Sequence, residues 1–152
     1  MPHPHTRNID QSLCLSVLSR APASEVKQFA DGLIPELGKI EVLHNRTGLA
    51  MLPMRDPVQG ATFYLGEVLL AEAHVRLTDH DIAGYAACLG PDVEHALAMA
   101  LIDAANAAGL ALQEEIADFV AAQAARLEAA DQHLLRQVEA TRVEMETFEW
   151  QS

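Results

Sequence analysis

Cysteine is scarce in this sequence, with only Cys14 and Cys88 among 152 residues. The two stand apart in apolar segments, without a CxxC pair and without histidines at zinc-ligand spacing. This argues against a disulfide framework and against a zinc site. We expect both thiols to be small, buried side chains. The pattern is typical of a reduced, cytoplasmic protein.

Basic residues are also few: ten lysines and arginines stand against 22 acidic residues, which gives a formal net charge of −12. Binding to nucleic acid requires clustered positive charge that displaces counterions, and binding to an anionic membrane surface requires it too. We therefore expect no nucleic acid and no membrane as a partner. The partners that we expect are therefore proteins or small molecules.

Long apolar runs are missing as well. The longest nearly apolar stretch, 96–112, contains Asp103 and Asn106 and is too short to span a bilayer. Residues 1–7 lack the apolar segment of a signal peptide and are predicted to form a flexible arm. Half of all residues are apolar, so we expect residues 8–152 to fold as a single α+β domain with a substantial core.

Helical spacing marks two N-terminal helices. The first begins after an N-cap at Asn8 or Asp10, and the second begins at Pro22 and ends near Ile34, because Pro35 removes a backbone donor. Their predicted buried faces are Leu13, Cys14, Val17 and Leu18 in the first helix, and Val26, Phe29, Ala30 and Leu33 in the second.

Strand signals fill the next region. We expect strands at 40–44, 49–54, 62–77 and 82–89, with turns at 45–48 and 79–81 and a loop at 56–60. Pro53 should lie in an edge strand or at a strand end. Alternation along 69–77 places the odd residues on one face and His74 on the opposite, solvent-facing side. The prediction is an α+β fold with a small antiparallel sheet of three to four strands, packed with the N-terminal helices and a helical C-terminal half.

The C-terminal half is predicted to contain a helix from Pro91 to Gly109 and then one long helix at 112–150, where Gly and Pro are absent. An unbroken helix of that length would measure roughly 55–60 Å and overhang a small domain. An apolar stripe that leaves its own domain needs another chain to cover it. A break near Asp131, which could cap a new helix, is the alternative. The candidate interface residues are Phe119, Leu127, Leu134, Val138, Met145 and Phe148.

Catalytic signatures are absent: the sequence has no P-loop, no dinucleotide-binding glycine motif, no nucleophile elbow and no zinc-protease motif. Asp79 and Asp81 could form an acid/base pair, although two aspartates in a tight turn usually serve the turn. Asp103 lies either on the exposed edge of its helix or opposite an arginine of a partner. Arginine suits bidentate phosphate contact, so Arg46, Arg55 and Arg76 are candidate phosphate or partner contacts, with surface salt bridges as the alternative.

Several short motifs in collinear order resemble the PhnG family, the G subunit of the bacterial phosphonate carbon–phosphorus (C–P) lyase core complex. They are Ser16-Val17-Leu18, Arg46-Thr47-Gly48-Leu49-Ala50, Leu65-Gly66-Glu67 with Ala73-His74-Val75-Arg76-Leu77, Gly84-Tyr85, Leu89-Gly90, and Ala100-Leu101-Ile102-Asp103-Ala104. Ala140-Thr141-Arg142-Val143-Glu144 is similar to the family's C-terminal "TRVDFF" segment, and it adds Arg142 to the candidate contacts.

The resemblance implies an accessory subunit that acts with the H, I and J subunits. The complex uses ATP as a substrate: a phosphonate displaces adenine and gives ribose 1-phosphonate 5-triphosphate, and the I subunit is generally viewed as catalytic. No cofactor is implied for this chain itself. Taken alone, the chain is expected to form a homo-oligomer, because its apolar stripe would lack cover.

Two other hypotheses compete with the accessory subunit. A stand-alone enzyme would require Arg46, Arg55 and Arg76 to converge on one pocket beside an acid/base residue. A generic homodimeric interaction module would have the same apolar stripe but no role in phosphonate metabolism.

Overall fold

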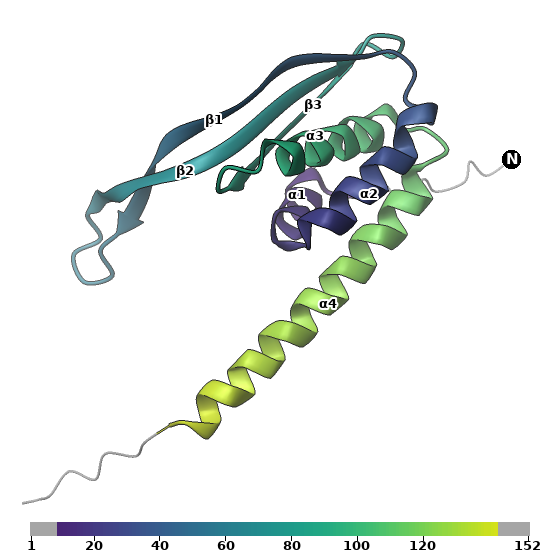
Figure 1. Ribbon diagram of the computed structural model, residues 1–152. Coiled ribbons are helices and arrows are strands. Elements are labelled where there is room, and N and C mark those ends of the chain that lie inside the picture. The colour runs from purple at the N-terminus through teal and green to yellow at the C-terminus, as the bar shows by residue number, and fades with distance from the viewer. Residues whose placement is uncertain (1–8, 143–152) are drawn as a thin grey trace, which may run out of the picture.

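The structure is a computed structural model that describes residues 9–142. It is an α+β fold, as predicted, with a three-stranded antiparallel sheet of order β1-β2-β3 and helices on one side of it (Figure 1). In chain order the elements are α1 Gln11–Arg20, α2 Ala23–Leu33, the short 3-10 helix η1 Ile34–Glu36, β1 Ile40–Arg55, β2 Thr62–Leu77, β3 Ile82–Leu89, α3 Val93–Ala108 and α4 Gln113–Ala140.

The two N-terminal helices begin and end as their sequence predicts. The Asp10 side chain caps α1 by accepting a hydrogen bond from the Leu13 backbone N–H at 3.0 Å, and Pro35 lies in the 3-10 turn that follows α2. Leu13 itself is an error of the prediction, because its side chain is 57 % exposed. At about 100° per residue it lies at the rim of the stripe formed by Cys14, Val17 and Leu18, which are buried.

The predicted turn at 45–48 is wrong, because β1 is one continuous strand of 16 residues. Asn45 to Gly48 pair in register with β2 residues Ala73 to Leu70, and Gly48 has no positive φ. The chain reverses only after Arg55, in the loop that was predicted at 56–60, where Gly60 has a φ of 69°. Pro53 lies in an edge strand, as expected, beside one of the two register shifts between β1 and β2. Sheet pairing has overridden a local turn signal.

One part of the core lies between the inner face of the sheet and α3, and the other lies among α1, α2, α3 and the start of α4. Ala71, Ala73, Val75 and Leu77 alternate along β2 and are fully buried, as the pattern predicted. Gly84 of β3 allows a very close helix–strand contact: a Cβ atom added there would lie 2.2 Å from the Ala100 backbone oxygen. Only glycine fits at such an approach.

Helix α3 is the central layer of the body, because the sheet packs on one side of it and α1 and α2 pack on the other (Figure 1). Eleven of its 16 residues are buried, which is more than the single stripe expected from the sequence. Both predictions for Asp103, an exposed position at the helix edge and a contact with an arginine of a partner, are wrong, because Asp103 is only 3 % exposed. Its carboxylate accepts hydrogen bonds from Gln11 Nε2 and from the Tyr85 backbone N–H, each at 3.0 Å. It thereby joins α1, α3 and β3.

Candidate functional site: two projecting apolar elements

Helix α4 leaves the body of the protein and projects into solvent (Figure 1). It runs without a break through Asp131, so the alternative of a second helix starting there does not hold. Its 28 residues span about 42 Å. The helix ends at Ala140; the rest of the predicted stretch, from residue 143, lies outside the described residues.

The first half of α4 is covered by the protein's own body. Ile116 and Val120 are buried, Leu127 is half-buried against the core, and the Phe119 ring stacks on Phe29 of α2 at 4.0 Å between centroids. Phe119 and Leu127 therefore pack within their own chain.

Two ion pairs fasten α4 to the N-terminal helices. Arg20 of α1 donates to both oxygens of Asp131 at 2.8 and 2.9 Å. Arg126 and Gln123 donate to the Glu25 carboxylate of α2, each at 2.7 Å to one of its oxygens. The hydrogen bond from Arg126 holds the pKa of Glu25 below its ordinary value. The last of these contacts is at Asp131, and the helix continues beyond it without support.

The second half of α4 is exposed to solvent, and among the described residues its one hydrogen-bonded contact with the body is the Arg20–Asp131 ion pair. Every residue from 128 to 142 is exposed, and Leu134, Leu135 and Val138 are 59, 62 and 58 % exposed. Of the candidate interface residues, Leu134 and Val138 therefore present apolar surface to solvent, whereas Met145 and Phe148 lie outside the described residues. We call residues 128–140 the distal half of α4.

A second projection, which the sequence reading missed, is formed by the β1–β2 hairpin. Strand β3 pairs only with Leu70 to Leu77 of β2, so residues 49–69 extend past the body as a two-stranded ribbon (Figure 1). We call this ribbon the arm. Its exposed large apolar side chains are Leu49, Met51, Leu52, Met54, Val58, Phe63, Tyr64, Leu65 and Leu69.

A signal for the arm was present in the sequence. The runs Phe63 to Leu65 and Val68 to Leu70 do not alternate between apolar and polar residues, which is typical of strands covered on both faces. Among the described residues nothing covers the arm on either face. An apolar surface of this kind is typical of a site for interaction with another molecule.

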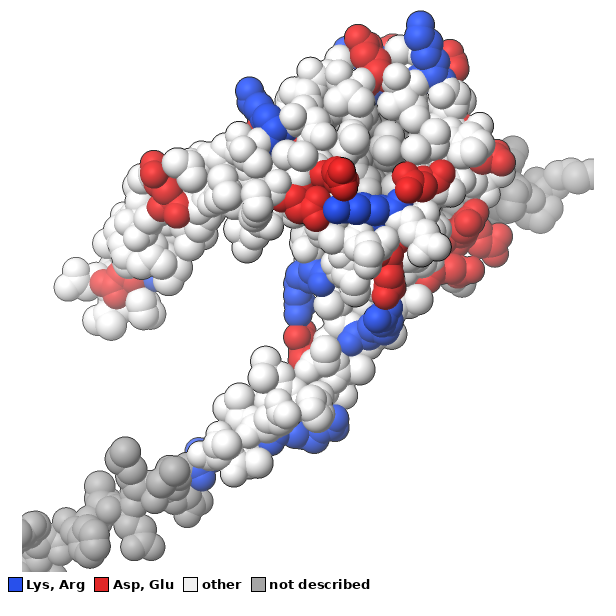
Figure 2. All heavy atoms as spheres, viewed as in Figure 1, with Lys and Arg blue, Asp and Glu red and all other residues white. Residues whose placement is uncertain are grey.

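Both projections carry little charge. The arm has three charged side chains, Arg55, Asp56 and Glu67, and the distal half of α4 has one basic side chain, Arg136, and three acidic ones. Figure 2 shows the arm and α4 as mostly uncharged surfaces with an open hollow between them, while charged groups gather on the body. The arm and the distal half of α4 contribute −1 and −2 to the net charge of −12, so most of the negative charge lies elsewhere in the chain.

The candidate arginines do not form a common pocket. Arg46 Nε donates to Glu72 Oε1 at 2.7 Å, and Arg55 donates to the Gly60 carbonyl in the hairpin turn at 3.3 Å. These two arginines are nine residues apart on β1, or about 30 Å. Arg76 is exposed opposite Glu41, and Arg142 lies 3.9 Å from Glu139 at the end of α4. Arg46, Arg55 and Arg76 therefore do not converge on the shared pocket that a stand-alone enzyme built on them would require.

A polar cluster lies on the outer face of the sheet, opposite α3. Glu72 accepts from Arg46 and, at 2.8 Å, from the Tyr85 hydroxyl, and the rings of His44, His74 and Tyr85 pack edge to face beside it. The hydrogen bond from Arg46 lowers the pKa of Glu72, and the hydrogen bond to Glu72 raises the pKa of Tyr85. His74 faces outward, as expected, although it is half-buried in this cluster.

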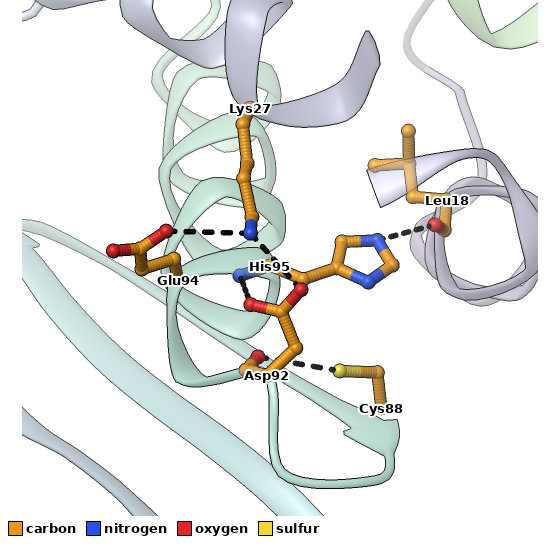
Figure 3. Close-up of polar contacts among 6 residues, drawn as sticks. All are labelled: Leu18, Lys27, Cys88, Asp92, Glu94 and His95. Carbon is orange, nitrogen blue, oxygen red and sulfur yellow. Dashed lines mark hydrogen bonds and ion pairs between the residues drawn. The ribbon is translucent and has the colours of Figure 1, made fainter. Parts of the chain in front are cut away.

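A second polar cluster holds the helices together near the start of α3 (Figure 3). Asp92 caps α3 by accepting from the His95 backbone N–H at 2.9 Å, and Lys27 of α2 lies 3.0 Å from Asp92 and 3.3 Å from Glu94. The His95 ring makes a 3.0 Å hydrogen bond to the Leu18 carbonyl of α1. These contacts connect three helices, so the cluster is structural.

Within residues 9–142, no group of three or more histidine, cysteine or acidic side chains is arranged to hold a metal ion. No helix in the same range combines the length and apolarity needed to cross a membrane.

The chain matches the family model described as "Phosphonate metabolism protein PhnG" over residues 10–149. It belongs to the PhnG family. The match covers both projecting elements and nearly the whole chain, and it places the protein in phosphonate metabolism. No curated protein matches the chain significantly.

Proposed function

We propose that this PhnG family member is an accessory, non-catalytic subunit of a cytoplasmic C–P lyase core complex with H, I and J subunits. In that complex it supports the displacement of adenine from ATP by a phosphonate, which gives ribose 1-phosphonate 5-triphosphate. ATP is a substrate of the complex, and the chain itself holds no cofactor. Alone, the chain forms a homo-oligomer.

The observation that carries the proposal is the bare distal half of α4. Exposed leucine and valine side chains in a row on a solvent-projecting helix are costly unless a partner covers them. Burying such a side chain contributes about 1.5–3 kcal/mol. The dispersed arginines support an accessory role, because a centre that binds ATP and a phosphonate together needs positive charge converging on these anions.

Co-purification tests the docking surface. The chain is co-expressed with the H, I and J subunits, the H subunit carries the affinity tag, and the amount of the chain retained is measured. The double variant Leu134→Glu, Val138→Glu places charge in the proposed contact and should reduce retention by about tenfold or more. Leu13→Glu is the matched control, because Leu13 is 57 % exposed and Leu134 is 59 %, but Leu13 lies on the body. Equal losses for both variants would contradict the docking role of α4.

Adenine release tests the proposed reaction. The H and I subunits, ATP and an alkyl phosphonate are incubated with or without this chain, and free adenine is measured chromatographically. We expect release only when the chain is present. Full release without the chain, or release by the chain alone, would overturn the accessory role.

A further inference from the structure

The open edge of β2 in the arm is an unfilled position in the sheet. Residues Leu70 to Leu77 of β2 lie between β1 and β3, whereas residues Thr62 to Val68 have β1 on one side only. The boundary is sharp, because the Gly90 N–H still donates to the Leu69 carbonyl at 2.9 Å and the chain then turns away with a Gly90 φ of 97°. A seven-residue strand edge is left in line with β3.

An open, apolar strand edge is a template for pairing with another chain. Natural edge strands commonly carry charged residues that prevent such pairing. The segment from Thr62 to Val68 has a single charged side chain, Glu67, and includes Phe63, Tyr64 and Leu65, which are 47, 65 and 61 % exposed. The edge is therefore open to pairing rather than protected from it.

We propose that this edge pairs with the same edge of a second copy of the chain, antiparallel, around a two-fold axis at Leu65. The inference identifies the surface of the homo-oligomer in the proposed function and does not depend on phosphonate chemistry. In this pairing each copy fills the vacant position in the other's sheet. The contact is isologous, as two-fold dimers require.

The side chains on this edge are compatible with self-pairing. With Leu65 on the axis, Thr62 lies opposite Val68 of the second copy, Phe63 opposite Glu67, and Tyr64 opposite Gly66. No like charges face one another, which would be destabilising. The register shift of β2 also falls at Leu65, between Gly66 and Tyr64, so the ladder consists of two short halves that flank the axis.

The distribution of charge along the chain allows a second copy to pair with this strand edge. Two chains of net charge −12 repel one another when their bodies approach. The pairing edge lies in the arm, which projects from the body and contains only three charged side chains. Two copies can therefore pair through their arms while most of their negative charge stays apart.

Sedimentation velocity of the purified chain, from 1 to 100 µM, tests the association. We expect a monomer–dimer equilibrium. Phe63→Glu places a glutamate opposite Glu67 of the second copy twice in each dimer, and it should raise the dissociation constant by about tenfold or more. Phe63→Lys faces the same glutamate with opposite charge, and its effect should stay within about threefold.

Met54→Glu is the matched control for the edge. Met54 pairs directly with Phe63 across the arm and is 44 % exposed, but it lies on β1, away from the proposed contact. Its dissociation constant should stay within about threefold of the wild type. Equal weakening by Phe63→Glu, Phe63→Lys and Met54→Glu would overturn edge pairing, because the apolar faces would then carry the contact.

A single introduced cysteine tests the position of the axis. Leu65→Cys should form a disulfide-linked dimer under mild oxidation, because directly opposed residues bring their Cβ atoms close to disulfide distance. Leu49→Cys, at a similarly exposed site on β1 (66 % against 61 %), should not. A chain that stays monomeric at 100 µM, or that crosslinks equally at both positions, would overturn the second-copy inference. The co-purification with H, I and J subunits would still report on the proposed function separately.

Discussion

Phe29 of α2 and Phe119 of α4 stack face to face, with ring centroids 4.0 Å apart and ring planes 3° from parallel. The stack belongs to the covered part of the predicted apolar stripe of the long helix, whereas a second part of the stripe is exposed. The part that contains Phe119 packs against the body, and the part beyond Asp131 is the surface that we propose for a partner. Substitutions in the two parts should therefore change different quantities.

Phe119→Ala should lower the free energy of unfolding by about 2 kcal/mol, because it removes the aromatic stack and part of the half-buried packing. Urea denaturation followed by circular dichroism measures this change. Leu134→Ala, on the exposed half of the same helix, should stay within about 0.5 kcal/mol of the wild type. If Leu134→Ala were as destabilising as Phe119→Ala, the distal half of α4 would have to pack within its own chain.

Gly84→Ala should destabilise the protein by about 3 kcal/mol or more, because the new Cβ overlaps the α3 backbone and forces the helix away from β3. Gly66→Ala is the control, since nothing lies within 4 Å of a Cβ atom at that position. It should be neutral or slightly stabilising, because alanine reduces the freedom of the unfolded chain. Thermal unfolding of both variants measures the contrast. A stable Gly84→Ala protein would refute the close approach of β3 and α3.

Asp92→Ala should cost about 1 kcal/mol of stability at neutral pH through loss of the α3 cap. The hydrogen bond from the His95 backbone N–H, followed by that from Lys27, lowers the pKa of Asp92 in the folded protein. Its stabilising contribution is therefore complete above the unfolded value of about 3.9 and is lost as the pH falls through the lower folded pKa. The stability difference between wild type and Asp92→Ala should accordingly shrink on acidification, as urea titrations from pH 7 to pH 2.5 would measure.

Asp92→Asn supplies the control for this pH dependence. Asparagine also caps a helix N-terminus but has no carboxyl group to titrate. Relative to Asp92→Ala, its capping advantage should persist at acidic pH. A wild-type advantage that stays constant down to pH 2.5 would show that the ionised carboxylate of Asp92 does not contribute.

Cys14 should resist thiol reagents in the folded protein. Burial, reinforced by the negative charge of Asp103, raises the pKa of the Cys14 thiol to about 11, and its side chain is 1 % exposed. Burial also raises the pKa of the Cys88 thiol. Reaction with a chromogenic disulfide at pH 8 should therefore be slow until urea unfolds the chain, whereas Leu65→Cys should add one fast-reacting thiol. Rapid labelling of the wild type would contradict the burial of both cysteines.

The sequence predicted best where local signals and tertiary packing agree. Asp10 caps α1, Pro35 lies just beyond the end of α2, and Ala71 to Leu77 alternate as expected. It predicted worst where neighbouring strands decide the outcome. The turn signal at Asn45 to Gly48 was overridden because β2 offers a continuous pairing edge along it, which a reading confined to local residues does not include.

The candidate site was predicted only in part, for a similar reason. The bare second half of α4 follows from its length and its apolar spacing, so Leu134 and Val138 could be named in advance. The arm depends on β3 ending at Leu89, eight residues short of the end of the hairpin. That difference in strand length depends on pairing and is not encoded in any single segment. Asp103 was likewise ambiguous until Gln11 and Tyr85 were brought to it from distant parts of the chain.

The continuity of α4 has a mechanical consequence. The helix is anchored by the Phe119 stack and by ion pairs at Arg126 and Asp131, and no glycine or proline interrupts it before Ala140. A subunit that binds the last turns would therefore hold a stiff lever that ends about 14 Å beyond its last anchor. Small rotations of that subunit would be passed to the whole body, so the orientation of the sheet and the arm within an assembly would be set from the tip of this one helix.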